Sequence, residues 1–125
     1  MASRGSVTGW KLDRDDRAKL LALFPPQYAD TDADHVTLAR QPRGADLPPE
    51  VDAQVVGRAD DGDSLECLVV SVDGTTDRPD GSTFHITWSL DRSKRQARES
   101  NNLLKENGWQ PIDRPIPIRI EPARF

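Results

Sequence analysis

The amino-acid sequence predicts a single α+β domain that is built from antiparallel strands and two main helices. Its 125 residues suit one compact domain and are too few for two ordinary ones, so residues 1–125 are treated as one unit. Alternating and β-branched runs outnumber helical patterns, and a turn-forming stretch between two of these runs indicates a hairpin. Because hydrophobic residues make up 35% and the chain has 10 Pro and 8 Gly, we expect a modest core with prominent loops.

The first part of the chain predicts a strand, a helix and a second strand. Residues 7–12 have the pattern of a short strand, and Asp13 has the side chain of an N-cap, with Asp16 in the position of a capping box. An apolar stripe follows, and a pair of prolines ends the helix near Phe24. After an acidic loop, residues 35–39 are β-branched and alternating, which predicts the second strand.

The middle of the chain predicts three more strands. Residues 51–59 and 65–72 are separated by the turn-forming sequence Asp-Asp-Gly-Asp at 60–63, which predicts an antiparallel hairpin. A polar loop at 73–82 leads to the strand 84–90, whose alternation is the clearest in the chain. The side chains expected to face the core from this strand are Phe84, Ile86, Trp88 and Leu90.

The last part of the chain predicts a short helix and a final strand. Ser100 is a candidate N-cap for a helix that ends at Gly108. Isoleucines then alternate with Pro and Arg over residues 116–120, and the prolines confine this strand to a sheet edge. The predicted order is strand, helix, four strands, helix, strand.

Composition and charge exclude several classes of protein. No stretch approaches the roughly 20 apolar residues of a bilayer crossing, and residues 1–7 lack the apolar core of a secretory signal. The single Cys67 cannot form an internal disulfide or a thiolate metal cluster, so we expect a reducing, cytoplasmic setting without a membrane partner. A net charge of −4 argues against a long contact with a nucleic-acid backbone, but leaves an RNA terminus or a small phosphate ester.

The only two histidines of the chain occur in the same local pattern. Residues 35–38 and 85–88 both have the sequence His-aliphatic-Thr-hydrophobic. Side chains at i and i+2 of a strand lie on one face, so each motif presents an imidazole and a hydroxyl to the same surface. One copy is readily explained by β propensity, whereas the repetition at both histidines indicates a functional pair.

Two imidazoles that face each other across a cleft suit an in-line displacement at phosphorus. One ring accepts a proton from water while the other donates a proton to the leaving oxygen, and the ordinary pKa of histidine, near 6.5, allows both roles near neutrality. The Thr hydroxyls would bind the nonbridging phosphate oxygens. This chemistry requires no metal.

Three rival interpretations remain open at this stage. A metal site would use His35 with Asp30, Asp32 and Asp34, although Asp34 would point away from His35 if the strand extends as far as residue 34. A noncatalytic module would bind RNA ends or a cyclic nucleotide in the same cleft. An interaction domain would have both motifs by accident and would place the imidazoles on separate faces.

The two motifs, within a small α+β protein, resemble those of the 2H phosphoesterase superfamily. Further segments are similar to the cyclic phosphodiesterase module of RNA-repair and tRNA-ligase type proteins: residues 8–10 (Thr-Gly-Trp), 23–26 (Leu-Phe-Pro-Pro) and 98–101 (Arg-Glu-Ser-Asn). The resemblance implies two pseudo-symmetric lobes of antiparallel sheet around a central cleft. It also implies hydrolysis of a 2′,3′-cyclic phosphate on an RNA end or nucleotide, usually to a 2′-phosphate, without metal or other cofactor.

Site residues follow from the same resemblance. His35 and His85 would be the catalytic acid–base pair, and Thr37 and Thr87 would bind the phosphate. The family pattern suggests His35 as the acid toward the departing 3′ oxygen and His85 as the base toward water, while the sequence alone leaves swapped roles open. An RNA ligase or kinase would be a functional associate. The interval between the histidines is shorter than in many members, so loops that shape the pocket must be trimmed and the substrate preference stays open.

Several other polar side chains are candidate substrate contacts. Cations near the motifs could meet a phosphate, Tyr28 could stack on a base, and the residues after the second motif could hydrogen-bond substrate. A solvated basic turn, loop packing and helix capping are the simpler explanations of the same residues. The candidates are Lys11, Tyr28, Arg40, Arg95, Arg98, Ser100 and Asn101.

Overall fold

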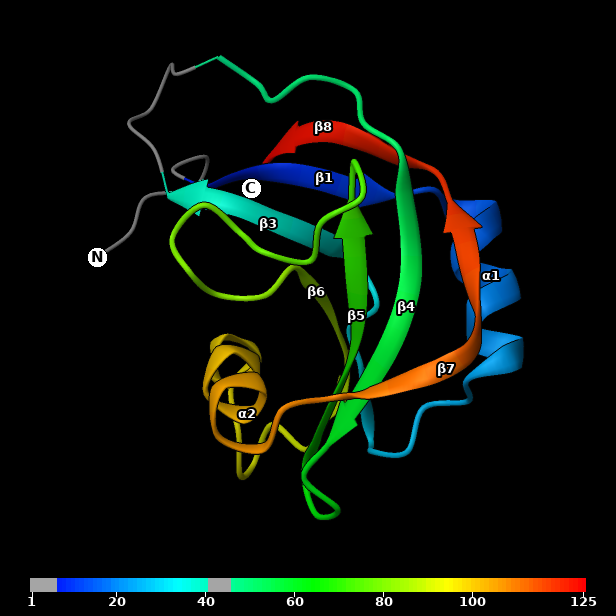
Figure 1. The fold of residues 1–125 in the computed structure, drawn as a ribbon. Coiled ribbons are helices and arrows are strands. Elements are labelled where there is room, and N and C mark those ends of the chain that lie inside the picture. The colour runs from blue at the N-terminus through cyan, green and yellow to red at the C-terminus, as the bar shows by residue number, and fades with distance from the viewer. Residues whose placement is uncertain (1–6, 41–45) are drawn as a thin grey trace.

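The computed structural model describes residues 7–40 and 46–125, which form a mixed α+β fold of two antiparallel sheets and two α-helices (Figure 1). This confirms the predicted fold class at that level. Residues 1–6, on which most of the expectation about a secretory signal rests, lie outside the described residues. Neither helix in the described ranges has the length and apolar character that a bilayer crossing requires.

The smaller sheet has three strands and carries the first histidine motif. Its order is β3-β1-β8, with β1 at Val7–Leu12, β3 at His35–Arg40 and β8 at Ile120–Arg124. β1 approaches β3 very closely at Gly9, where a Cβ would lie 2.1 Å from the carbonyl oxygen of Val36. Only glycine permits this approach, because every other residue has a Cβ atom. Gly9 therefore sets the position of the strand that carries His35.

The larger sheet has five strands and carries the second motif. Its order is β2-β6-β5-β4-β7, with bounds Asp30–Thr31 for β2, His85–Leu90 for β6, Leu65–Val72 for β5, Ala53–Asp60 for β4 and Gln110–Ile118 for β7. β4 and β5 form the predicted antiparallel hairpin. β5 lies at the centre of the sheet and is buried along almost its whole length. The four side chains predicted to face the core from residues 84–90 are all buried.

The two faces of the five-stranded sheet are covered by different elements. On one face, Leu68 and Val70 of β5 pack in a core that also includes Trp10 of β1, Val36 of β3 and Leu20 of α1. The other face packs against the second helix, whose buried leucines are Leu103 and Leu104. Figure 1 shows α1 and α2 well apart, on either side of the strands.

Helix α1, Arg14–Leu23, begins and ends where the sequence predicts. The carboxylate of Asp13 accepts a hydrogen bond from the backbone N–H of Asp16 at 3.0 Å, which confirms the N-cap. The reciprocal half of the capping box is wrong, because the Asp16 carboxylate instead accepts bonds from the backbone N–H of Arg119 at 2.7 Å and its Nη2 at 2.9 Å. The cationic Arg119, between the last two strands of the chain, replaces the bond from Asp16 back to the backbone of Asp13.

The prediction that Ser100 is a helix N-cap is wrong. A 3₁₀ turn, η1 at Ala97–Glu99, precedes α2 at Ser100–Asn107, so Ser100 is the first residue within the helix. Its side chain is fully buried and is hydrogen-bonded to Thr87 rather than to its own helix. The predicted end at Gly108 is confirmed, since Gly108 is the C-cap with a left-handed φ of 69°.

The end of the chain forms two strands where the sequence predicts one. β7 pairs with β4 and β8 pairs with β1, so the chain leaves one sheet and joins the other at Arg119. Both strands lie at sheet edges, as the prolines predict. The short β2, only 2 residues long, is also absent from the predicted order. Such pairings depend on distant partners, which local alternation does not identify.

Candidate active site

Both histidines and both motif threonines line one cleft of about 590 Å³. His35 and Thr37 come from β3 of the smaller sheet, whereas His85 and Thr87 come from β6 of the larger sheet. β3 and β6 contact each other although they belong to different sheets. The structure therefore brings together the four motif side chains in one cleft.

Residues 32–34 carry the chain from the larger sheet to the smaller one. The backbone N–H groups of Asp32 and Ala33 donate to carbonyl oxygens of β6 at 2.9 Å, and that of Leu12 in β1 donates to the carbonyl of Asp34 at 3.0 Å. Ala33 is fully buried and has a left-handed φ of 50°, which turns the chain from β2 into β3. This connection fixes the first motif beside the strand of the second.

The His35 ring is held by an ionised carboxylate. Its Nδ1 lies 3.0 Å from Oδ2 of Asp34, which also accepts a bond from Lys11 Nζ at 2.6 Å. Burial raises the pKa of Asp34, but the hydrogen bonds from Lys11 and His35 outweigh burial and lower it to about 2. Since a carboxylate only accepts, Nδ1 carries the proton and Nε2 is the nitrogen available to a ligand.

Two further contacts around His35 escaped sequence reasoning. Asp34 would point away only if the strand extended to residue 34, but β3 begins at His35, and the Asp34 carboxylate contacts the His35 ring. The ring of Phe125 also lies on the His35 ring, with centroids 4.2 Å apart and planes tilted by 34°. Phe125 lines the cleft and its backbone N–H is bonded to the Val7 carbonyl. This ring contact restricts rotation of the imidazole.

His85 has a contrasting environment. It is only 8% exposed, and its Nδ1 lies 2.7 Å from the carbonyl oxygen of Thr83. A carbonyl can only accept, so Nδ1 is protonated and Nε2 has a free lone pair when the ring is neutral. Burial lowers the pKa of His85 to about 4, aided by the charges of Arg78 and His35 and opposed by the bond to Thr83. The ring is neutral at pH 7.

The two threonines differ in their support. Thr37 lines the cleft half-buried from β3. Thr87 Oγ1 lies 2.9 Å from Ser100 Oγ and 3.3 Å from the carbonyl oxygen of Ala97, so α2 and the turn before it orient this hydroxyl. Ser100 thus belongs to the site as a support for Thr87, a role that its sequence position at a helix start did not suggest.

Arg78 lines the cleft and was missed by the sequence analysis. Its guanidinium donates from Nε and Nη2 to the two carboxylate oxygens of Asp80 at 3.2 and 3.1 Å, and from Nη2 to Asn101 Oδ1 at 3.2 Å. Arg78 comes from the polar loop before β6, where the only signal was a cation in a turn that leads into the second motif. Asp32, a carboxylate whose pKa is raised by burial, lines the cleft as well.

Three of the seven candidate contacts line the cleft directly, namely Arg40, Arg98 and Asn101. Lys11 instead binds Asp34 and lies with its Nζ 5.3 Å from the centroid of the Phe125 ring, so it supports the His35 side of the site. Ser100 stands behind Thr87. These five surround the motif residues either at the cleft wall or one contact behind it.

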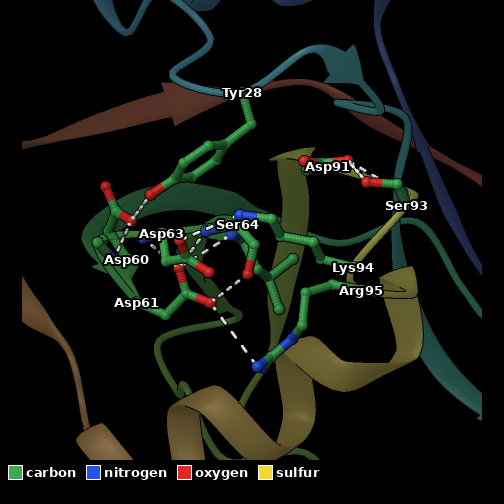
Figure 2. Close-up of polar contacts among 11 residues, drawn as sticks. Tyr28, Asp60, Asp61, Asp63, Ser64, Asp91, Ser93, Lys94 and Arg95 are labelled. Atoms are coloured by element: carbon green, nitrogen blue, oxygen red, sulfur yellow. Dashed lines mark hydrogen bonds and ion pairs between the residues drawn. The ribbon is translucent and has the colours of Figure 1, made fainter.

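Tyr28 and Arg95 are not brought to the cleft. Figure 2 shows both at the turn between β4 and β5. The Tyr28 hydroxyl donates to Asp60, and Arg95 Nη1 lies 3.7 Å from Oδ2 of Asp61. Burial, with the bond to Asp60, raises the pKa of Tyr28. Asp61 also accepts bonds from the backbone N–H groups of residues 63–65, so this cluster stabilises the hairpin turn.

Two of the acidic residues considered for a metal site have other partners. Asp30 accepts a bond from the backbone N–H of Arg92 at 2.9 Å, and Asp34 is bonded to Lys11 and His35. Within the described ranges, no three His, Cys, Asp or Glu side chains gather in a group that could hold a metal ion.

Comparisons of the chain with protein-family models, with curated proteins and with solved structures found no match.

Proposed function

We propose that this protein is a metal-independent phosphodiesterase that opens 2′,3′-cyclic phosphates at RNA ends or on nucleotides. One observation carries the proposal: His35 and His85 line one cleft from two different sheets, and each ring has Nδ1 bonded to a pure acceptor. Nε2 of each ring is then the nitrogen available to substrate. Two such nitrogens and two hydroxyls suit general acid–base catalysis at phosphorus.

The contacts of the two rings favour His85 as the base and His35 as the acid. A neutral His85 can accept a proton from water at Nε2 as the water oxygen attacks phosphorus. The ionised Asp34 stabilises positive charge on His35, which donates its Nε2 proton to the leaving 3′ oxygen as the P–O3′ bond breaks. The product is a 2′-phosphomonoester with a free 3′ hydroxyl. Proton exchange with solvent then resets both rings.

The threonines would hold the nonbridging oxygens during this displacement. Ser100 can donate to Thr87 Oγ1, and the Thr87 hydroxyl would then exchange its 3.3 Å bond to the Ala97 carbonyl for a bond to the phosphate. Thr37 would supply the equivalent contact from β3. We also propose that the two sheets act as pseudo-symmetric lobes on either side of the cleft, each of which contributes one His-x-Thr strand.

The test is turnover of 2′,3′-cyclic nucleotides and of RNA ending in a cyclic phosphate, in the presence of EDTA. We expect native protein to release the 2′-phosphate, and His35→Ala and His85→Ala each to lose about 10²- to 10⁴-fold of the rate. Tyr28→Phe, which changes a residue outside the cleft, serves as the control and should retain activity. Binding without turnover would indicate a noncatalytic module that binds RNA ends or cyclic nucleotides. The absence of both binding and turnover would contradict both functions.

A further inference from the structure

Arg78 is unusual among the cations of the protein. It is 8% exposed, and it is the only Lys or Arg within residues 7–40 and 46–125 that is buried. A buried charge is costly unless a partner neutralises it, and Asp80 provides that partner through two parallel hydrogen bonds. The same side chain lines the cleft, where its charge would meet an anionic ligand.

The guanidinium is only partly occupied by its protein partners. Nε and Nη2 bind Asp80, and Nη2 also binds Asn101. Nη1 has no hydrogen-bond partner among the described residues, while the side chain as a whole lines the cleft. The donors of Nη1 are therefore free for a ligand in the cleft.

Arg78 is fixed in position before any ligand binds. Its backbone N–H donates to the Ser82 carbonyl at 2.8 Å, and its own carbonyl accepts a bond from Gly81 at 2.9 Å, which closes a tight turn. Hydrogen bonds from Arg78 and Ser82 hold the pKa of Asp80 well below its usual range, so this partner stays ionised. Asn101 ties the same guanidinium to α2, one residue beyond the Ser100 that orients Thr87.

We propose that Arg78 is the principal anion-binding residue of the cleft and that it donates from Nη1 to a nonbridging oxygen of the bound phosphate. This rests on the proposed function for the identity of the substrate, and it adds a residue that the two motifs do not supply. Arg40 and Arg98 also line the cleft but are exposed. A flexible exposed arginine loses side-chain entropy when it binds, whereas Arg78 has already lost it.

The position of Arg78 has a second consequence for His85. The charges acting on the His85 ring are those of Arg78, His35 and Asp80, of which the first two disfavour its protonation and the third favours it. Removal of the Arg78 charge should therefore raise the pKa of His85. This readout does not depend on turnover and can be followed by NMR titration of the imidazole.

The binding test compares Arg78→Gln with two arginine variants that lose the same charge. Arg98→Gln removes an exposed cation of the same cleft, and Arg95→Gln removes a cation outside it. Calorimetric titration with adenosine 2′-monophosphate and with inorganic phosphate should show a loss of affinity of about 10- to 100-fold for Arg78→Gln. Arg98→Gln should lose much less and Arg95→Gln nothing.

Arg78→Lys keeps the experiment decisive if Arg78→Gln does not fold. A lysine ammonium retains the buried charge but has one nitrogen, which cannot serve Asp80 and the phosphate with the fixed fork of a guanidinium. We expect about 5-fold weaker phosphate binding or more, which is about the net contribution of one ordinary hydrogen bond. Native-like affinity in Arg78→Lys, or in a folded Arg78→Gln, would overturn the proposal.

The outcomes separate this proposal from the proposed function. Turnover by native protein, together with phosphate binding that Arg78→Gln leaves intact, refutes the role of Arg78 and leaves the phosphodiesterase standing. Phosphate binding that depends on Arg78, without turnover of any cyclic phosphate, supports the anion site and refutes the hydrolytic function. Failure of native protein to bind either phosphate refutes the role of Arg78, and the absence of turnover as well refutes both proposals.

Discussion

Nδ1 of His85 lies 2.7 Å from the carbonyl oxygen of Thr83, so the opposite nitrogen of this buried ring has a free lone pair. The other histidine of the cleft, His35, has its Nδ1 on a carboxylate instead. A carbonyl is neutral and a carboxylate is charged, so the two rings have different electrostatic surroundings. This difference supports distinct roles for two side chains whose sequence motifs are nearly identical.

The pH dependence of activity should reflect the low pKa of His85. Burial first, and then the charges of Arg78 and His35, lower that pKa from 6.5 to about 4. The acidic limb of the kcat/KM profile, which reports the base of the free enzyme, should therefore fall near pH 4 rather than near neutrality. A measurement of kcat/KM from about pH 3.5 to about pH 9 tests this position of the acidic limb. An acidic limb at 6 to 7, about the value of an unperturbed histidine, would contradict the role of His85 as base.

Folding stability should depend on pH through the same ring. The pKa of His85 is about 4 in the folded protein against 6.5 for an ordinary histidine, so the unfolded chain binds more protons between these values. The free energy of unfolding should accordingly decrease as pH falls from 6.5 to 4, by about 3 kcal/mol at most. Urea titrations of native protein and of His85→Gln isolate this contribution, because the variant should lack that part of the slope. Parallel curves would show that His85 is not the group responsible.

Replacement of Asp34 by Asn should weaken catalysis more than substrate binding. The neutral amide no longer stabilises positive charge on His35, and it no longer neutralises Lys11. We expect kcat to fall by about 10- to 100-fold, with a small change in KM. Asp15→Asn, an exposed carboxylate on α1, provides the matched control and should behave like native protein. A change confined to KM would assign Asp34 to substrate binding instead.

Ser100→Ala should impair the site through Thr87. The serine hydroxyl lies 2.9 Å from Thr87 Oγ1, and its removal leaves that hydroxyl with fewer restraints and one hydrogen bond less. We expect unfolding to become easier by about 1 kcal/mol and kcat/KM to fall several-fold. Asn102→Ala, two positions along α2 and exposed, is the control. Thr87→Ala combined with Ser100→Ala should add little to Thr87→Ala alone, and full additivity in this double-mutant cycle would argue against the coupling.

Gly9→Ala should disrupt the strand that carries His35. Its Cβ would lie 2.1 Å from the Val36 carbonyl oxygen, a backbone atom that cannot rotate away. We expect a loss of about 3 kcal/mol or more in the free energy of unfolding. Gly62→Ala is the comparison, because a Cβ there has no atom within 4 Å. The only destabilisation expected comes from the left-handed φ of 77°. Its loss should be about 1 kcal/mol. Equal losses in urea unfolding would exclude steric contact with β3 as the cause.

Local patterns in the sequence determined much of the fold. The burial of the hydrophobic side chains of residues 84–90, the hairpin turn at 60–63 and the cap at Asp13 each depend on neighbours in the chain, and each is confirmed. Strict alternation ends before Leu90, which packs with the leucines of α2 and not with Phe84, Ile86 and Trp88. The same logic placed His and Thr two positions apart on one face of each motif strand. Side-chain periodicity and turn chemistry act over a few residues, which is why sequence alone could reveal them.

Contacts between distant segments were decided only by the tertiary structure. Ser100 has the side chain of a helix cap, yet the hydroxyl of Thr87 on another strand is its partner. Arg78 lies in an ordinary polar loop until Asp80 and α2 fix its guanidinium at the cleft. The division of the last residues between β7 and β8 depends on their pairing with β4 and β1. Each depends on burial and hydrogen bonding between segments that only folding brings together, so no local pattern of residues encodes it.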